Sequence, residues 1–334
     1  MARRGDRPRQ GCGAQMTRGK STASTDAGNK GTLEADRRAR SFRIGAHEIA
    51  ARPLEPGLYL VSTPIGNLGD MTIRGLETLS GADIIACEDT RVSRVLLDRF
   101  GIATRPHAYH EHNAERAGPK LMEALEAGKS VALISDAGTP LVSDPGYRLS
   151  QTAIEAGIPV IPIPGASAPM AALVASGLPS DTFLFAGFLP SKDKARRDRL
   201  ASFAATEATL MFFESPNRIA ACLKSAAAVL GADRPAAVCR ELTKAYEEIR
   251  RGTLGDLAAR YEDESVRGEI VLVIGPGSTP APSEGDVDLL LAKLAADLPA
   301  GKAATEAARL TGLPRKDLYA RLLALKATSP EGEA

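Results

Sequence analysis

The residues best suited to bind a ligand form a loop that follows the apolar run from Val131 to Ile134. Glycine removes side-chain bulk, proline restricts the backbone and aspartate supplies carboxylates, so backbone amides in such a loop can approach a ligand closely. The loop contains two residues of each type, namely Gly138 and Gly146, Pro140 and Pro145, and Asp136 and Asp144. A tight connection between a strand and a helix would explain a single loop of this kind without any ligand.

Two further loops have the same composition and also follow apolar runs. The first, TPIGNLGD at 63–70, follows the run LYLVS at 58–62, and the other, PGAS at 164–167, follows a run that begins at Ile158. Because parallel strands place their carboxyl ends at one edge of a sheet, three such loops predict a shared ligand site. The glycine spacing differs from GxGxxG, which argues against a dinucleotide-binding domain of the NAD type.

Four polar residues, from Glu88 to Arg91, come directly after a fourth apolar run, Ile84 to Cys87. Their position predicts that they lie at the same edge of the sheet as the three loops. A helix is expected to begin within these four residues. Asp89 and Arg91 are therefore either part of the ligand site or a structural pair at the start of a helix.

Strand-like and helical runs alternate along residues 54–276, which predicts the α/β class. We expect an N-terminal α/β domain over 54–164 and a C-terminal α/β domain over 165–276. The strand-like runs of the second domain are FLFAG at 183–187, TLMFFE at 209–214, AAVCRE at 236–241 and IVLVIG at 270–275.

Two further segments follow residue 276. Proline and glycine dominate the first, which predicts a linker over 277–285. Apolar residues at helical spacing then predict a short helical appendage over 286–327, in which the turn GLP separates two helices. This arrangement resembles a helix-turn-helix pair and is equally compatible with an appendage that only packs on the rest of the chain.

Charge is distributed unevenly along the 334 residues, although the formal net charge is only +1. Residues 1–52 contain 12 Lys and Arg against 5 Asp and Glu, a net charge of +7, which leaves −6 on the rest. Few large apolar residues occur there, which predicts a disordered basic extension over 1–53. Such a segment is compatible with an unstructured extension, a start codon assigned too early or an arm that binds polyanions.

Other patterns exclude several classes of protein. No apolar stretch reaches the ~18 residues that span a bilayer, and no apolar segment follows the basic start, so we expect a cytoplasmic protein without membrane segments. The four cysteines form no CxxC pair, which favours buried thiols over disulfides or zinc ligands. Three of the four histidines fall within 107–117, but they lack the HExxH pattern, so we expect no metal.

Eight motifs in a fixed order resemble the tetrapyrrole methylase superfamily and, within it, the branch that methylates RNA of the small ribosomal subunit. The resemblance covers about residues 54–276, continues more weakly through the appendage and leaves residues 1–52 outside. The motifs are STPIGNLGD, EDTR, SDAGTPLVSDPGY, PGAS, SGLPSDTFLFAGFLP, ESPNR, RELTKAYEE and RGEIVLVIG.

The resemblance implies two α/β domains of the tetrapyrrole methylase type, with the cofactor S-adenosylmethionine in the cleft between them. It implies methyl transfer to the 2′-hydroxyl of a cytidine ribose in the decoding region of 16S ribosomal RNA, within the small subunit, by a homodimer. Loops at strand ends are compatible with this cofactor, because amides bind its carboxylate and Asp136 or carbonyls can face its ammonium group. They do not identify the cofactor by themselves.

Transferred motif by motif, most of the implied cofactor-binding residues lie in the three loops, where backbone contacts are expected to dominate. Those in the first domain are Thr63, Pro64, Gly66, Ser135, Asp136, Ala137, Gly138, Thr139, Asp144 and Pro145. Those after the domain boundary are Gly165, Ala166, Ser167, Glu214, Ser215, Pro216, Arg240, Glu241 and Leu242. The last six come at strand ends, where helix capping explains them equally well.

The implied reaction requires a weakly nucleophilic ribose hydroxyl to be held in line with the methyl group. Glu88 and Asp89 are the carboxylates placed to accept the hydroxyl proton, and Arg91 would orient one of them or bind a phosphate. Positioning alone is the alternative, because the methyl donor is already activated, and in that case no general base is needed.

The segment SKDKARRDR at 191–199 is the strongest candidate for RNA contact. Its Lys and Arg side chains would neutralise phosphates, although a solvated helix face has the same composition. The expected contact residues are Lys192, Lys194, Arg196, Arg197 and Arg199, with Arg218 and Lys244 as weaker additions.

Two other functions fit the same fold. A tetrapyrrole C-methyltransferase would act on an acidic macrocycle, and the motifs ESPNR and RELTK argue against it. A non-catalytic RNA-binding assembly protein would use the basic extension and the helical appendage. Affinity for S-adenosylmethionine separates this second alternative, because a pure RNA binder needs no cofactor.

Overall fold

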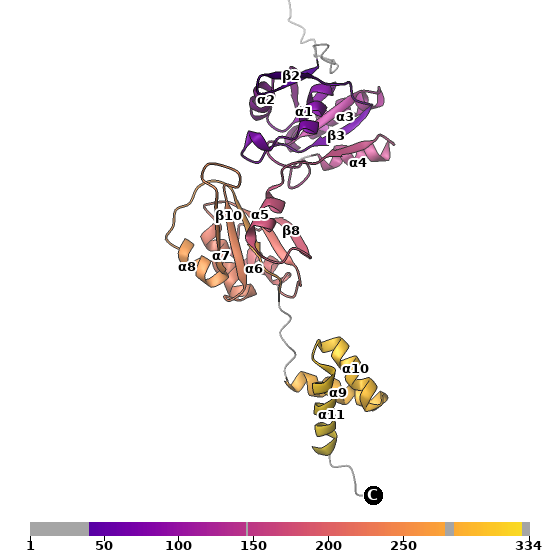
Figure 1. Ribbon diagram of the computed structural model, residues 1–334, viewed down its shortest axis with the longest axis vertical. Coiled ribbons are helices and arrows are strands. Elements are labelled where there is room, and N and C mark those ends of the chain that lie inside the picture. Colours follow the sequence, from indigo (N-terminus) through magenta and orange to yellow (C-terminus); the bar gives the residue numbers. More distant parts are fainter. Residues whose placement is uncertain (1–39, 145, 278–283, 329–334) are drawn as a thin grey trace, which may run out of the picture.

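The computed structural model describes residues 40–144, 146–277 and 284–328 of the chain. Figure 1 shows two units built on β-sheets, followed by a unit of helices. Each sheet has five strands and is covered by helices on both faces, which confirms the predicted α/β class. Among the described residues, no helix is both long and apolar enough to cross a membrane.

The first unit contains a parallel sheet in the order β5-β4-β6-β3-β7. Its strands are β3 (Gly57–Val61), β4 (Ile84–Cys87), β5 (Pro106–Ala108), β6 (Ser130–Ile134) and β7 (Val160–Ile163). Its helices are α1 (Ile73–Gly81) and α2 (Thr90–Arg99) on one face and α3 (Ala114–Glu126) and α4 (Tyr147–Glu155) on the other. Because both faces are covered, the central strands are continuous apolar runs, and their ends bring the predicted loops to one edge.

The second unit contains a sheet in the order β11-β10-β12-β9-β8, in which β8 and β9 are parallel and the other pairs are antiparallel. Its strands are β8 (Phe183–Phe188), β9 (Thr209–Glu214), β10 (Pro235–Arg240), β11 (Glu248–Thr253) and β12 (Ile270–Ile274). Helix α5 (Ala168–Ser176) packs on one face, and the other is covered by α6 (Asp193–Ala201), α7 (Ile219–Leu230) and α8 (Leu254–Tyr261). The sequence did not predict β11, because the run EIRRGT is polar.

The prediction of a disordered extension is wrong for residues 40–53. Strands β1 (Ser41–Ile44) and β2 (His47–Ala50) form an antiparallel hairpin that packs on the first unit. The side chain of Phe42 is 1% exposed and lies among the apolar side chains of α1 and α2. A single aromatic anchor and hydrogen bonds to neighbouring elements therefore hold a mostly exposed segment in place. Residues 1–39 lie outside the described part of the chain.

Three helices form the last unit, namely α9 (Glu284–Asp297), α10 (Ala300–Thr311) and α11 (Arg315–Thr328). They share a small core that contains Leu291, Ala303 and Leu322. Gly312, at a φ of 71°, ends α10 in the left-handed conformation and allows the turn into α11. The predicted appendage is thus a compact helical unit, and most of the predicted linker lies outside the described residues.

Candidate active site

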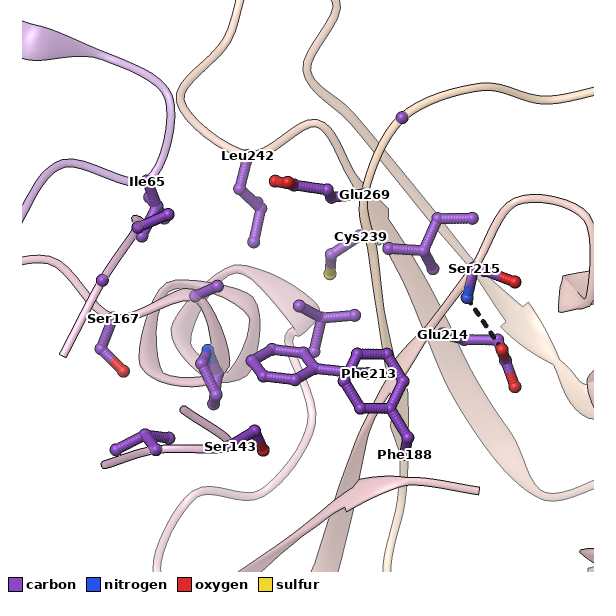
Figure 2. A pocket seen from close by; sticks show the side chains of 18 of the residues that line it. Ile65, Ser143, Ser167, Phe188, Phe213, Glu214, Ser215, Cys239, Leu242 and Glu269 are labelled. Carbon is purple, nitrogen blue, oxygen red and sulfur yellow. Dashed lines mark hydrogen bonds between the residues drawn. The ribbon is translucent and has the colours of Figure 1, made fainter. Parts of the chain in front are cut away.

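A cavity of about 350 Å³ lies between the two sheet units, at the edge where the strands of the first sheet end. Figure 2 shows that side chains from both units point into it. The first unit and the beginning of α5 with its N-cap contribute Ile65, Ala137, Gly138, Thr139, Val142, Ser143, Asp144, Ser167, Ala168 and Pro169. The second sheet and its loops contribute Phe188, Phe213, Glu214, Ser215, Pro216, Cys239, Leu242, Gly268, Glu269, Ile270 and Val271.

Hydrogen bonds connect the three predicted loops into one frame. Thr63 and Gly138 form an antiparallel bridge, in which the amide of each donates to the carbonyl of the other at 2.9 and 3.1 Å. The hydroxyl of Thr139 lies 3.0 Å from that of Ser62 and 3.2 Å from the carbonyl of Ala166, to which it donates. The amide of Gly138 therefore donates within the frame. It is not free to donate to a ligand, contrary to what the composition of the loop had suggested.

Unusual backbone conformations occur where the frame borders the cavity. Leu141 and Ser143 have φ values of 71° and 67°, a region that costs non-glycine residues energy. Gly146, at 127°, also has a positive φ, and a Cβ there would approach the side chain of Leu133 to 2.7 Å. This stretch is held in a conformation that its residues would not adopt alone, which places Ser143 and Asp144 against the cavity.

The second unit supplies an apolar wall. Phe213 lies with its ring centroid 4.9 Å from that of Phe185 and 5.4 Å from that of Phe188. Cys239 and Leu242 also point to the cavity (Figure 2), and Ile270 and Val271 of β12 line it as well. Burial raises the pKa of the Cys239 thiol to about 11, so the wall carries no thiolate at neutral pH.

Carboxylates gather on the side of the first unit. Asp144 lines the cavity, and its pKa is raised to about 6 by burial and by the charges of Glu88 and Asp136, against a hydrogen bond from Ser135. Burial and the charge of Asp136 likewise raise the pKa of Glu88. Each of these carboxyl groups holds a proton more readily than a solvated one, which suits a proton acceptor that works near neutral pH.

Asp89 and Arg91 have a different environment from Glu88. Asp89 is the N-cap of α2: its carboxylate accepts from the amide of Arg91 at 2.8 Å and from the guanidinium of the same residue at 2.6 Å. These bonds lower the pKa of Asp89 to about 2, which makes it a poor proton acceptor. The geometry thus favours the structural alternative for this pair.

The cavity includes about half of the residues implied to bind the cofactor. Ala137, Gly138, Thr139, Asp144, Ser167, Glu214, Ser215, Pro216 and Leu242 line it. Thr63, Pro64, Gly66, Ser135, Asp136, Gly165, Ala166, Arg240 and Glu241 do not, and Pro145 lies outside the described residues. Several of the second group have framing roles; for example, a Cβ at Gly165 would lie 2.9 Å from that of Ser62.

Sequence reasoning missed the wall residues, above all Phe188, Phe213, Cys239 and Val271. All four lie within strands, whereas the glycine, proline and aspartate signals in the sequence fall in the loops that follow strands. The alternation of side chains along β9, β10 and β12 would have indicated two sets of residues, one for each face of the sheet. It does not indicate which face borders the first unit.

Helix α6 presents most of its basic residues to solvent, but the prediction for Arg196 is wrong. Its side chain is only 4% exposed and donates to Ser225 at 3.0 Å and to Asp193 at 2.9 Å, so it joins α6 to α7 and is not available to RNA. Lys194 and Arg199 on the helix and Lys192 at its N-cap are exposed, and Arg197 is partly exposed.

Lys244 and Arg218 are engaged inside the protein. Lys244 pairs with Glu241 at 2.8 Å and with Glu269 at 2.9 Å, and its aliphatic chain lies against Gly66 of the first unit. Arg218 pairs with Glu214 at 3.1 Å and donates to the carbonyl of Leu189. These contacts assign both residues to the support of the cavity rather than to a phosphate surface.

Buried thiols are found at Cys87, Cys222 and Cys239, as the scattered cysteines predicted, and Cys12 lies outside the described residues. Within the ranges that the structure covers, no group of three His, Cys, Asp or Glu side chains is arranged to hold a metal ion.

Comparison with protein families identifies two regions. Residues 57–258 match the model described as Tetrapyrrole (Corrin/Porphyrin) Methylases. Residues 281–326 match the model described as the RsmI C-terminal HTH domain, and this range includes α9, α10 and most of α11.

Curated relatives match along most of the chain. A protein from Mesorhizobium japonicum named Ribosomal RNA small subunit methyltransferase I is 62% identical over 291 residues, which are 87% of this chain and 99% of the relative. Its namesake from Escherichia coli O157:H7 is 47% identical over 78% of this chain and 93% of the relative.

Solved structures show the same fold at low sequence identity. A cobalt precorrin-4 methyltransferase of cobalamin biosynthesis aligns with a TM-score of 0.51 and 19% identity, over 65% of this chain and 94% of that one. A conserved hypothetical protein from Aeropyrum pernix K1 aligns with a TM-score of 0.53 and 18% identity, over 84% and 100%.

Proposed function

The chain belongs to the tetrapyrrole methylase family, and we propose that it methylates RNA of the small ribosomal subunit with S-adenosylmethionine, at the 2′-hydroxyl of a cytidine ribose in 16S rRNA. The observation that carries the proposal is the 62% identity to a ribosomal RNA small subunit methyltransferase I over 99% of that relative. The low-identity structural matches support the fold and do not decide the substrate.

The residues around the cavity fit S-adenosylmethionine. A cavity of about 350 Å³ falls within the range of ~300–1,000 Å³ that is typical of small-molecule sites. The apolar wall with Phe213, Cys239 and Leu242 suits an adenine ring, and the carboxylates of Asp144 and Glu269 suit a ligand with positive charges. When bound, the cofactor supplies a methyl group that is already activated on a sulfonium.

The chain itself supplies positioning and a proton acceptor. The frame of three loops holds Asp144 at the cavity, and the charge of Glu88 contributes to the raised pKa of Asp144, whereas burial and the charge of Asp136 raise the pKa of Glu88. We assign proton acceptance from the ribose hydroxyl to this pair, since Asp89 is held ionised by Arg91. Of the two proton acceptors expected from the sequence, Glu88 and Asp89, the proposal keeps Glu88, and it adds Asp144.

RNA contact is assigned to the exposed basic residues of α6, which follows β8 at the edge of the cavity. Lys192 and Lys194 are exposed there and Arg197 is partly exposed, although Lys194 and Arg197 also pair with acidic neighbours on the helix. If RNA phosphates replaced these acidic partners, the affinity for RNA would depend on salt concentration.

The working unit is proposed to be a homodimer in the cytoplasm. Met170 and Val174, one turn apart on α5, both expose apolar side chains on the same helical face. Sedimentation velocity of the parent and of Val174→Glu tests this assignment, with a dimer expected for the parent and a monomer for the variant. A monomeric parent would contradict it.

A labelled methyl-transfer assay tests the function directly. Small subunits, free 16S rRNA and a tetrapyrrole are offered side by side, and the modified site is mapped by its resistance to alkaline hydrolysis, which requires a free 2′-hydroxyl. Label is expected in the RNA of small subunits. Label in the tetrapyrrole would establish the C-methyltransferase alternative, and affinity for RNA without any for S-adenosylmethionine would establish the non-catalytic one.

A further inference from the structure

Phe188 is the most exposed aromatic side chain that lines the cavity. It is 59% exposed at the end of β8, the edge strand of the second sheet. One side of its ring packs on Phe213 at 5.4 Å between centroids, with an angle of 52° between the planes. Figure 2 shows both rings at the cavity, across from Ser143. Exposed apolar side chains occur elsewhere in the described residues, and Phe188 differs from them because its exposed ring also lines the cavity.

A β-bulge gives Phe188 this orientation. Phe185 pairs with Met211 and Phe188 pairs with Phe213, so three steps along β8 correspond to two along β9. Without the extra residue, Phe188 would point to the face opposite Phe185, because side chains alternate along a strand. Gly187 accommodates the bulge with a φ of 65°. The result is that Phe185 and Phe188 contact the same ring, that of Phe213.

The neighbours of Phe188 hold it firmly and connect it to both parts of the active site. Leu189 is buried, and its carbonyl accepts from Arg218, which also pairs with Glu214 of the cavity wall. On the other side, a Cβ at Gly187 would lie 3.5 Å from the hydroxyl of Ser143, the residue before Asp144. The exposed Lys192 follows four residues later. An aromatic face thus lies between the carboxylates and the basic helix.

We propose that Phe188 is the stacking platform for the base of the nucleotide that is methylated, an inference that rests on the proposed function. A base must leave its neighbours for its ribose to enter a cavity, and proteins commonly receive splayed RNA bases on aromatic side chains. Stacking on Phe188 would place the base at the mouth, the ribose hydroxyl toward Asp144 and the adjoining phosphates toward α6. Phe188 then determines RNA affinity and orientation without holding the cofactor.

Variants of the full chain test this role. Phe188→Ala removes the platform, Phe188→Leu keeps apolar bulk without a ring, and Phe188→Tyr keeps the ring. Phe183→Ala is the matched control, since Phe183 is 44% exposed on the same strand and does not line the cavity. We expect kcat/KM for small subunits to fall about 10- to 100-fold in the alanine and leucine variants. Tyrosine and the Phe183 control should retain parent values, and the dissociation constant of S-adenosylmethionine, measured by calorimetry, should change less than about twofold throughout.

A second measurement does not depend on turnover. A short single-stranded RNA that carries one pyrrolocytidine reports stacking through its fluorescence, which should change on binding to the parent and not to Phe188→Ala. If the parent failed to methylate small subunits, the proposed function would fail, while this signal would still decide whether Phe188 stacks a base. Weaker S-adenosylmethionine binding in Phe188→Ala would overturn the proposal by assigning the ring to the cofactor. Parent-like activity or fluorescence in Phe188→Ala would also overturn it.

Discussion

Asp144 combines a position at the cavity with an unusual carboxyl group. Its pKa is about 6, compared with an ordinary 3.8, because the group is half-buried and faces Glu88 and Asp136. Between about pH 4 and 6 the folded protein therefore binds more protons at this site than the unfolded chain does. Stability from this group is present at low pH and is lost as the pH rises through this window.

Asp144→Asn should consequently affect rate and stability in opposite directions. The amide cannot accept the proton, so kcat should fall about 100-fold or more if the carboxylate is the base. The parent's kcat should decline as the pH falls through about 6, and this step should vanish in the variant. The melting temperature of the variant should exceed that of the parent at pH 7 and match it near pH 4.

Asp89→Asn is the control for Asp144→Asn, since Asp89 is a helix cap whose pKa is already about 2. It should keep most of the activity. A small loss for Asp144→Asn together with an unchanged pH profile would leave positioning alone as the source of the rate.

The sequence predicted part of the site residue by residue, but not the roles that depend on tertiary contacts. Glycine, proline and aspartate in loops carry a local signal, and nine of the implied cofactor residues do line the cavity. The roles of Arg196 and Phe188 depend on tertiary contacts: the first is buried by Ser225 of another helix, and the second is turned by a bulge. Neither effect is visible in the local composition.

At the scale of elements, the hairpin β1–β2 shows how little sequence signal a packed segment needs. Its strands have four residues each, and most of their side chains are exposed. The long apolar strands of the first sheet were predictable because helices cover both of their faces. The short hairpin was not, because only Phe42 is buried.

Phe42→Ala should destabilise the first unit substantially. Loss of a fully buried phenylalanine typically costs about 3–5 kcal/mol, through lost transfer energy and the cavity left behind. Urea denaturation should therefore show a lower midpoint, whereas Ile49→Ala on the exposed side of the hairpin should have little effect. Equal midpoints for both variants would show that the hairpin does not contribute to the core.

At the scale of the whole molecule, acidic and basic residues are distributed unevenly among the three helices of the helical unit. Helix α9 has four acidic residues and one basic residue, whereas α10 and α11 together have six basic residues and two acidic ones. Lys302, Arg315 and Lys316 are exposed, and the guanidinium of Arg315 approaches Gly301 at the start of α10. This places the starts of α10 and α11 together as a basic surface, which suits a polyanion such as RNA.

Deletion of residues 284–328 should therefore weaken binding to small subunits and leave S-adenosylmethionine affinity unchanged. Filter binding at several salt concentrations should give a shallower salt dependence for the truncated protein, because fewer phosphates are neutralised. Lys302→Ala with Lys316→Ala should reproduce most of the loss in the full chain. An unchanged affinity for small subunits would show that the helical unit does not contribute to RNA binding and is only a packing appendage.

The bridge between Thr63 and Gly138 also has a consequence for hydrogen exchange. Both amides donate within the protein itself, so their deuterium uptake should be slow before any ligand is added. Addition of S-adenosylmethionine should then protect mainly the stretch around Val142 to Asp144, which lines the cavity beside the bridge. Mass spectrometry of short peptides would separate a frame that is already rigid from a rim that becomes ordered when the cofactor arrives.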